Sequence, residues 1–174
     1  DDGIPVRVKV TIDPEAGDPT DIARPLTGDD PAGIFDAVAD YLIGKGWTVE
    51  RESIPGGAHG YTDPEGRRVV LDSDLSPAQA AKTGLHEAAH VILHADEDHA
   101  EYVEHRGTKE TEAESVAYVV AGILGLDTSA YSVGYVAGWS NCDAETIKAT
   151  AANVLRAAHA LADALTEQPE AVAA

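Results

Sequence analysis

Hydrophobic residues recur at strand spacing mainly in the first half of the chain. Val6, Val8, Val10 and Ile12 alternate with polar residues, which predicts a strand over Ile4–Ile12. A second strand is predicted from Trp47 to Ile54. The segment 56–73 contains two extended runs separated by turn residues at Asp63–Gly66, and this pattern predicts a hairpin.

Four segments have hydrophobic residues at helical spacing. The first is expected to begin at Pro31 after the capping residue Asp30, and to end at Gly44 or Gly46. The second follows the cap Ser76 and Pro77 and spans Ala78 to Leu93. Residues 99–109 resemble a loop, after which further helices are predicted over 110–125 and, capped by Asp143, over 144–165. Strands followed by helices indicate an α+β domain.

The 174-residue length fits one domain with a substantial core. Residues 1–30 are expected to form an N-terminal strand and an irregular lead-in, because several prolines and acidic residues follow the strand. The domain itself is predicted to span residues 31–166. The tail 167–174 is expected to fray.

The composition narrows the classes of partner. The net charge of −19 disfavours direct contact between this domain and nucleic acid, because phosphate is also negative. No apolar run approaches the roughly 20 residues of a membrane span. The single cysteine, Cys142, cannot form an internal disulfide, which favours a cytoplasmic location. The chain lacks methionine, so we expect a piece of a longer protein, with room for a missing partner domain.

The segment His86-Glu87-Ala88-Ala89-His90 has the pattern H-E-x-x-H. Residues four apart lie on one face of a helix, so both imidazoles can reach one metal ion. Glu87 follows the first ligand and can act as a general base on the attacking water. His94 lies about 12 Å from His86 along a straight helix, at roughly 1.5 Å per residue, which is too far for a ligand of the same ion. A helix with two surface histidines is the alternative.

A third metal ligand is expected from the next helix, which opens with Glu110, Glu112 and Glu114. A glutamate there would complete a His₂Glu zinc site with an open position. Glu114 is favoured because it borders a stripe of small residues, Ala113, Ala117 and Ala121, that allows close packing on the HEAAH helix. Glu112 is the next candidate. Glu110 is expected nearest the first turn, where carboxylates also serve caps and the helix dipole.

Two longer segments together resemble a known family. "LHEAAHVILH" followed by "KETEAESVAYVVAGILGLDTSAYSVGYVAGW" resembles the ImmA/IrrE group of metallopeptidases, and is similar to the zincin-like C-terminal domain of ArdC antirestriction proteins. The preceding "GGAHGYTDPEGRRVVLDS" resembles the glycine-rich turn and hairpin of that group. The similarity covers roughly Gly56 to Leu165, and the first 50 residues have no match.

The resemblance implies a gluzincin-like fold, in which a small curved sheet with a hairpin packs on the HExxH helix and two further helices. Alignment on the Ala-Glu pair of the ArdC-like motif places the third ligand on Glu114. One zinc ion per chain is expected, although another divalent metal would also fit. The developing oxyanion needs a second donor. Tyr131 and Tyr135 are the candidates, with packing against Trp139 as their alternative role.

Three hypotheses for the function follow. The first is a zinc-dependent metalloendopeptidase that cleaves a specific protein or peptide substrate in a regulatory or mobile-element context. The second is a non-catalytic zincin-fold binding protein of the antirestriction or inhibitor type, which uses its acidic surface. The third treats the metal as a structural staple held by four protein ligands, including His94 or His105. The presence of Glu87 favours the enzyme, because a binder needs no general base.

Overall fold

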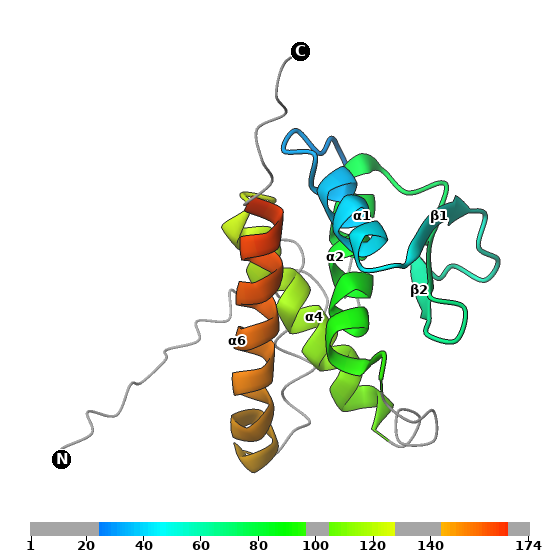
Figure 1. Cartoon of the computed structure of the whole chain (residues 1–174). Coiled ribbons are helices and arrows are strands. Elements are labelled where there is room, and N and C mark those ends of the chain that lie inside the picture. The colour runs from blue at the N-terminus through cyan, green and yellow to red at the C-terminus, as the bar shows by residue number, and fades with distance from the viewer. Residues whose placement is uncertain (1–24, 97–104, 128–143, 167–174) are drawn as a thin grey trace, which may run out of the picture.

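A central helix, α2 (Pro77–His94), separates a small sheet from the helices α4 (Arg106–Ile123) and α6 (Ala144–Thr166) (Figure 1). A further helix, α1 (Ile34–Gly44), also packs on α2. This computed structural model describes residues 25–96, 105–127 and 144–166. The architecture confirms the predicted α+β class, with a small sheet and its hairpin packed on the HEAAH helix.

The sheet has the strand order β1-β3-β2, formed by Thr48–Glu52, Arg68–Asp72 and Gly60–Asp63 respectively. β2 and β3 pair antiparallel, which confirms the hairpin. Its turn is held by the Gly66 N–H, which donates to Asp63 Oδ1 at 3.0 Å. β1 pairs with β3 in parallel. The central strand is therefore β3, and its residues Val69, Val70 and Leu71 are fully buried.

The start of α1 differs from the prediction by one turn. The helix begins at Ile34 and not at Pro31, because Gly33 has a left-handed backbone conformation with φ 64°. Asp30 still caps, since its Oδ2 accepts a hydrogen bond of 2.8 Å from the Phe35 N–H. The end at Gly44 agrees with the prediction.

Helix α2 begins as the sequence predicts. Ser76 is its N-cap and accepts a hydrogen bond from the Gln79 N–H at 3.2 Å, and Pro77 occupies the first position. Leu85 and the alanines next to the motif glutamate, Ala88 and Ala89, are completely buried. A helix covered by a sheet on one side and by helices on the other is buried on nearly every face. Its side chains must therefore be apolar, or polar with a partner that compensates for burial.

Helix α4 begins earlier than the sequence predicts. Residues 106–109 belong to the helix, so the predicted loop over 99–109 is wrong for that part. The predicted stripe of Ala113, Ala117 and Ala121 is completely buried in the core that α4 shares with α2. Because α4 begins at Arg106, Glu110 lies one full turn inside the helix and is not a first-turn residue.

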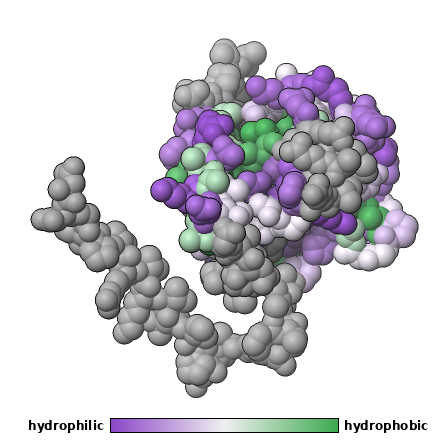
Figure 2. All heavy atoms as spheres, turned by 90° about the horizontal axis from the view of Figure 1, so that it is seen from below, coloured by the Kyte–Doolittle hydropathy of each residue, from purple (hydrophilic) through white to green (hydrophobic). Residues whose placement is uncertain are grey.

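Several predictions fall outside the described residues. They are the strand Ile4–Ile12, the cap Asp143, Tyr131, Tyr135 and the tail 167–174. Within the described part, no helix combines the length and apolarity needed to cross a membrane. On the face drawn in Figure 2, hydrophilic side chains cover most of the coloured surface, with a small hydrophobic area among them.

Gly60 of β2 is a point of close approach between the sheet and α2. A Cβ atom at this position would lie 2.9 Å from Thr83 Cγ2, 3.0 Å from the Val70 carbonyl oxygen and 3.2 Å from Glu87 Oε1. We therefore expect Gly60→Ala to lower the free energy of unfolding by about 1–3 kcal/mol, as overpacking does. Gly44→Ala is the control, because nothing lies within 4 Å of its Cβ position. Urea denaturation of both variants measures the difference, and equal stabilities would contradict this close approach.

Candidate metal centre

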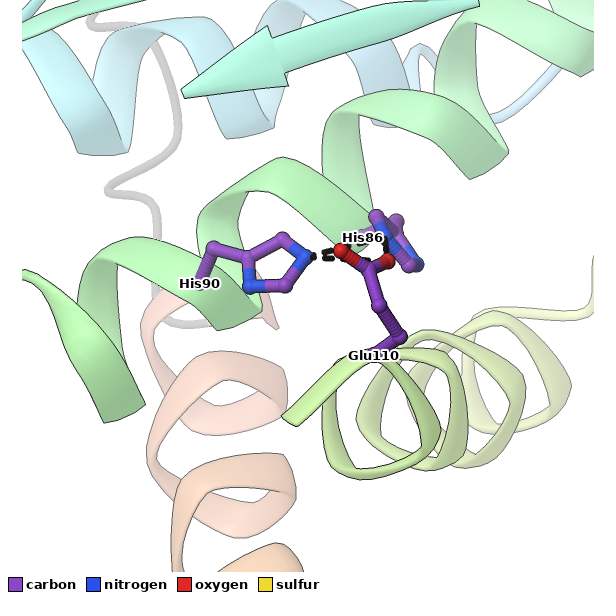
Figure 3. A group of neighbouring side chains, drawn as sticks. All are labelled: His86, His90 and Glu110. Atoms are coloured by element: carbon purple, nitrogen blue, oxygen red, sulfur yellow. Dashed lines mark hydrogen bonds and ion pairs between the residues drawn. The ribbon is translucent and has the colours of Figure 1, made fainter. Parts of the chain in front are cut away.

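Three side chains from two helices converge on one point (Figure 3). His86 Nε2 lies 3.1 Å from His90 Nε2 and 3.3 Å from Glu110 Oε2, and His90 Nε2 lies 3.6 Å from the same oxygen. Ligand atoms of a tetrahedral ion with bonds of about 2.0–2.1 Å lie roughly 3.3 Å apart. The spacing of these three donor atoms therefore fits one metal ion.

The secondary structure explains why these side chains meet. His86 and His90 are four residues apart on α2, so their side chains lie on one face of the helix, and their rings meet edge to face with centroids 4.7 Å apart. Glu110 lies one turn into α4, the helix that packs on α2 through the buried alanine stripe. Small side chains bring the two helix axes together, and a glutamate on one then reaches both histidines on the other.

The electrostatics of the cluster favour a cation. Burial lowers the pKa of His86, but hydrogen bonds with Glu110 and Glu114 outweigh burial and raise this pKa to about 9. The same hydrogen bonds with His86, together with those from His90, hold the pKa of Glu110 well below its usual range. In this structure a positively charged His86 balances the nearby carboxylates. A divalent ion would take that role with greater charge.

Glu114, the favoured third ligand, occupies a different position. Its Oε2 lies 3.1 Å from Nδ1 of His86, the ring nitrogen opposite the one that meets Glu110 and His90. The same oxygen lies 3.6 Å from Nζ of Lys82. The geometry therefore favours Glu110 over Glu114 beside the metal-facing nitrogens. Both glutamates lie on the face of α4 that meets His86, and the early start of α4 places Glu110 within the helix.

Glu112, the second candidate, faces another histidine. Its Oε2 lies 3.6 Å from Nε2 of His94, and both residues are buried. His94 is the next residue along the histidine face of α2, and its ring centroid lies 5.5 Å from that of His90. His94 lines a cavity of about 320 Å³ together with His105, Lys109 and Glu112, in agreement with its expected position outside the ligand set.

Glu87 points toward the sheet and is only 5% exposed. The Thr62 hydroxyl on β2 donates a hydrogen bond of 2.8 Å to its Oε2. Gly60, on the same strand as Thr62, has no side chain and so leaves room for the Glu87 carboxylate. The general-base candidate is thus held between α2 and the edge strand. Sequence reasoning missed both Thr62 and Lys82, because their roles depend on which strand and which helix pack on α2.

Comparison with known proteins identifies the fold. Residues 47–132 match the family model described as the IrrE N-terminal-like domain, Peptidase_M78. An uncharacterized protein of Bacillus anthracis is 31% identical over 99 residues, which are 56% of this chain and 16% of that relative's length. The crystal structure of the antirestriction protein ArdC from plasmid R388, in its metal-free form, is similar over 85% of this chain and 56% of that chain. Its TM-score is 0.53 at 23% identity. The resemblance read from the sequence is confirmed: the chain has the ImmA/IrrE-type, ArdC-like fold, and residues 47–132 match the model of the IrrE N-terminal-like domain.

Proposed function

We propose that this protein is a zinc-dependent metallopeptidase that hydrolyses a peptide bond in a specific protein substrate. His86, His90 and Glu110 hold the ion, and Glu87 is the general base. The observation that carries the proposal is the spacing of 3.1–3.6 Å among three donor atoms, directly beside a buried glutamate. We place the activity in a cytoplasmic regulatory or mobile-element context, which the fold's likeness to a plasmid protein supports.

The donor set suits zinc better than the hard cations. Two imidazoles and one carboxylate form a known set for catalytic zinc, whereas calcium and magnesium are held mainly by oxygen. A bound zinc ion would polarise the scissile carbonyl and lower the pKa of a water molecule at the site. Glu87 would accept the proton of the attacking water and deliver it to the leaving amine. The hydrogen bond from Thr62 to Oε2 would hold this carboxylate in one orientation.

An open ligand position supports a catalytic metal site over a purely structural one. Among the described residues, the group that can hold an ion contains only His86, His90 and Glu110. His94 is not in this group, and its Nε2 instead meets Glu112. Three protein ligands leave a position for water or substrate, as in catalytic zinc sites. Tyr131 and Tyr135 stay predictions for the second donor to the oxyanion.

A non-catalytic binding function is the second candidate. The fold resembles that of an antirestriction protein, and the chain carries a net charge of −19. Proteins of one fold can have different functions. A protein with this fold and an acidic surface can therefore bind a partner without catalysing a reaction. In that case the metal centre would stabilise the fold, and Glu87 would have no role in the function.

Replacing the proposed third ligand tests the metal centre. We expect Glu110→Gln to weaken zinc binding by more than about 100-fold, which exceeds the usual effect of an outer-shell change. Glu112→Gln is the matched control, since it removes a buried carboxylate from the same helix beside a histidine outside the ligand set. Competition with a chelator measures both affinities. Equal losses in the two variants would rule out Glu110 as a specific ligand.

Replacing the proposed general base separates enzyme from binder. Glu87→Gln preserves size and leaves the three ligands in place, so stoichiometric zinc binding should survive. Peptide cleavage should fall by about 10²–10⁴-fold, the usual contribution of a positioned acid–base group. Digestion of candidate protein substrates measures the rate, and melting temperatures with zinc present control for stability. If the zinc-loaded variant cleaves as fast as the wild type, Glu87 is not the general base. If the variant keeps the biological effect and neither protein cleaves a substrate, the non-catalytic binding function is favoured.

A further inference from the structure

Lys82 is a buried lysine on the helix that carries the metal-binding histidines. Its side chain is 7% exposed, and it lies one turn before His86 on α2. Burial lowers the pKa of Lys82 to about 8, although the neighbouring Glu114 opposes this shift. Burying an ammonium group is costly unless a partner compensates. The position therefore calls for an explanation beyond packing.

The partner of Lys82 connects it to the metal centre. Glu114 Oε2 lies 3.6 Å from Lys82 Nζ and 3.1 Å from His86 Nδ1, so one carboxylate oxygen meets both groups. A histidine that donates through Nδ1 presents the lone pair of Nε2. In His86 it is Nε2 that faces His90 and Glu110. The contact with Glu114 thus selects the tautomer and the ring orientation that a metal requires.

We propose that Glu114 and Lys82 are positioning residues of the metal centre: Glu114 orients His86 with Nε2 toward the ion, and Lys82 holds the Glu114 carboxylate in place. This inference rests on the proposed function, because it concerns the same site. It assigns Glu114 a role outside the ligand set. It also gives a function to a lysine that the peptidase chemistry does not use.

The charges around the site agree with this arrangement. Three carboxylates, those of Glu87, Glu110 and Glu114, surround the histidines. A divalent ion held there would neutralise two of these negative charges, and the ammonium of Lys82 would neutralise the third. Without a cation at position 82, the partly buried carboxylate of Glu114 would lose the positive charge beside it and would keep its contact with the neutral imidazole of His86. Such a group would tend to take up a proton or move toward solvent.

The first experiment titrates the full chain with Co²⁺, whose visible absorption reports both occupancy and ligand geometry. Glu114→Gln removes the charge that orients His86, and we expect it to weaken Co²⁺ binding by about 10–100-fold. Glu112→Gln is again the matched control, because it alters a carboxylate of the same helix that meets His94 and whose side chain is 10% exposed, against 14% for Glu114. Its affinity and absorption should equal those of the wild type.

The second experiment asks whether Lys82 acts through Glu114. Lys82→Met keeps the apolar stem, and we expect it to weaken Co²⁺ binding by about 10-fold, at the low end of outer-shell effects. In the Glu114→Gln background the same change should alter the affinity less than about 2-fold, because the contact it supports is already lost. Circular dichroism checks the fold of each variant. If Lys82→Met does not fold, Lys82→Gln carries the same comparison.

Two results would overturn the inference while leaving the metal centre intact. If Glu114→Gln binds Co²⁺ as tightly as Glu112→Gln does, the Glu114 contact is structural only. If loss of Lys82 tightens binding equally in both backgrounds, Lys82 acts only as a nearby positive charge that repels the ion. Failure of the wild-type protein to bind Co²⁺ or Zn²⁺ would instead contradict the proposed function itself.

Discussion

The close packing of α2 against α4 is the contact on which the rest of the structure depends. Alanines on both helices are completely buried in their shared core, so the two axes approach closely and polar side chains beside the stripe are forced together. His86, His90 and Glu110 meet because of that approach, and so do Lys82 and Glu114. Larger side chains in the stripe would separate the helices, and the donor atoms would lose the spacing that fits an ion.

This packing leaves an unusual number of ionisable groups inside the protein. Glu87, His90, His94, Lys109 and Glu112 are all buried among apolar residues. Each such group would be costly alone, and the structure compensates by pairing across the α2–α4 interface. The result is a row of three histidines along one face of α2 that meet carboxylates of α4. His86 and His90 both meet Glu110, and His94 meets Glu112.

The sheet supplies the other half of the site. Its edge strand β2 lies against α2, and Gly60 and Thr62 enclose the carboxylate of Glu87. The sheet thus holds Glu87, the general-base candidate, while His86 and His90 of α2 meet Glu110 of α4. A fold of this type does not by itself determine an activity.

The sequence by itself determined the local structure and the motif. Periodicity and turn chemistry predicted the α+β class and the hairpin, capping at Ser76 predicted the start of α2, and four-residue spacing paired His86 with His90. These features depend on neighbours along the chain. The tertiary structure decided which glutamate meets the histidines, the parallel pairing of β1 with β3, and the roles of Thr62 and Lys82. Glu110, Glu112 and Glu114 are nearly equivalent along the chain, and each of them meets a histidine of α2. The sequence contains no strong cap before Arg106, so it does not fix where α4 begins, and the packing of α4 on α2 decides which carboxylate meets which ring nitrogen.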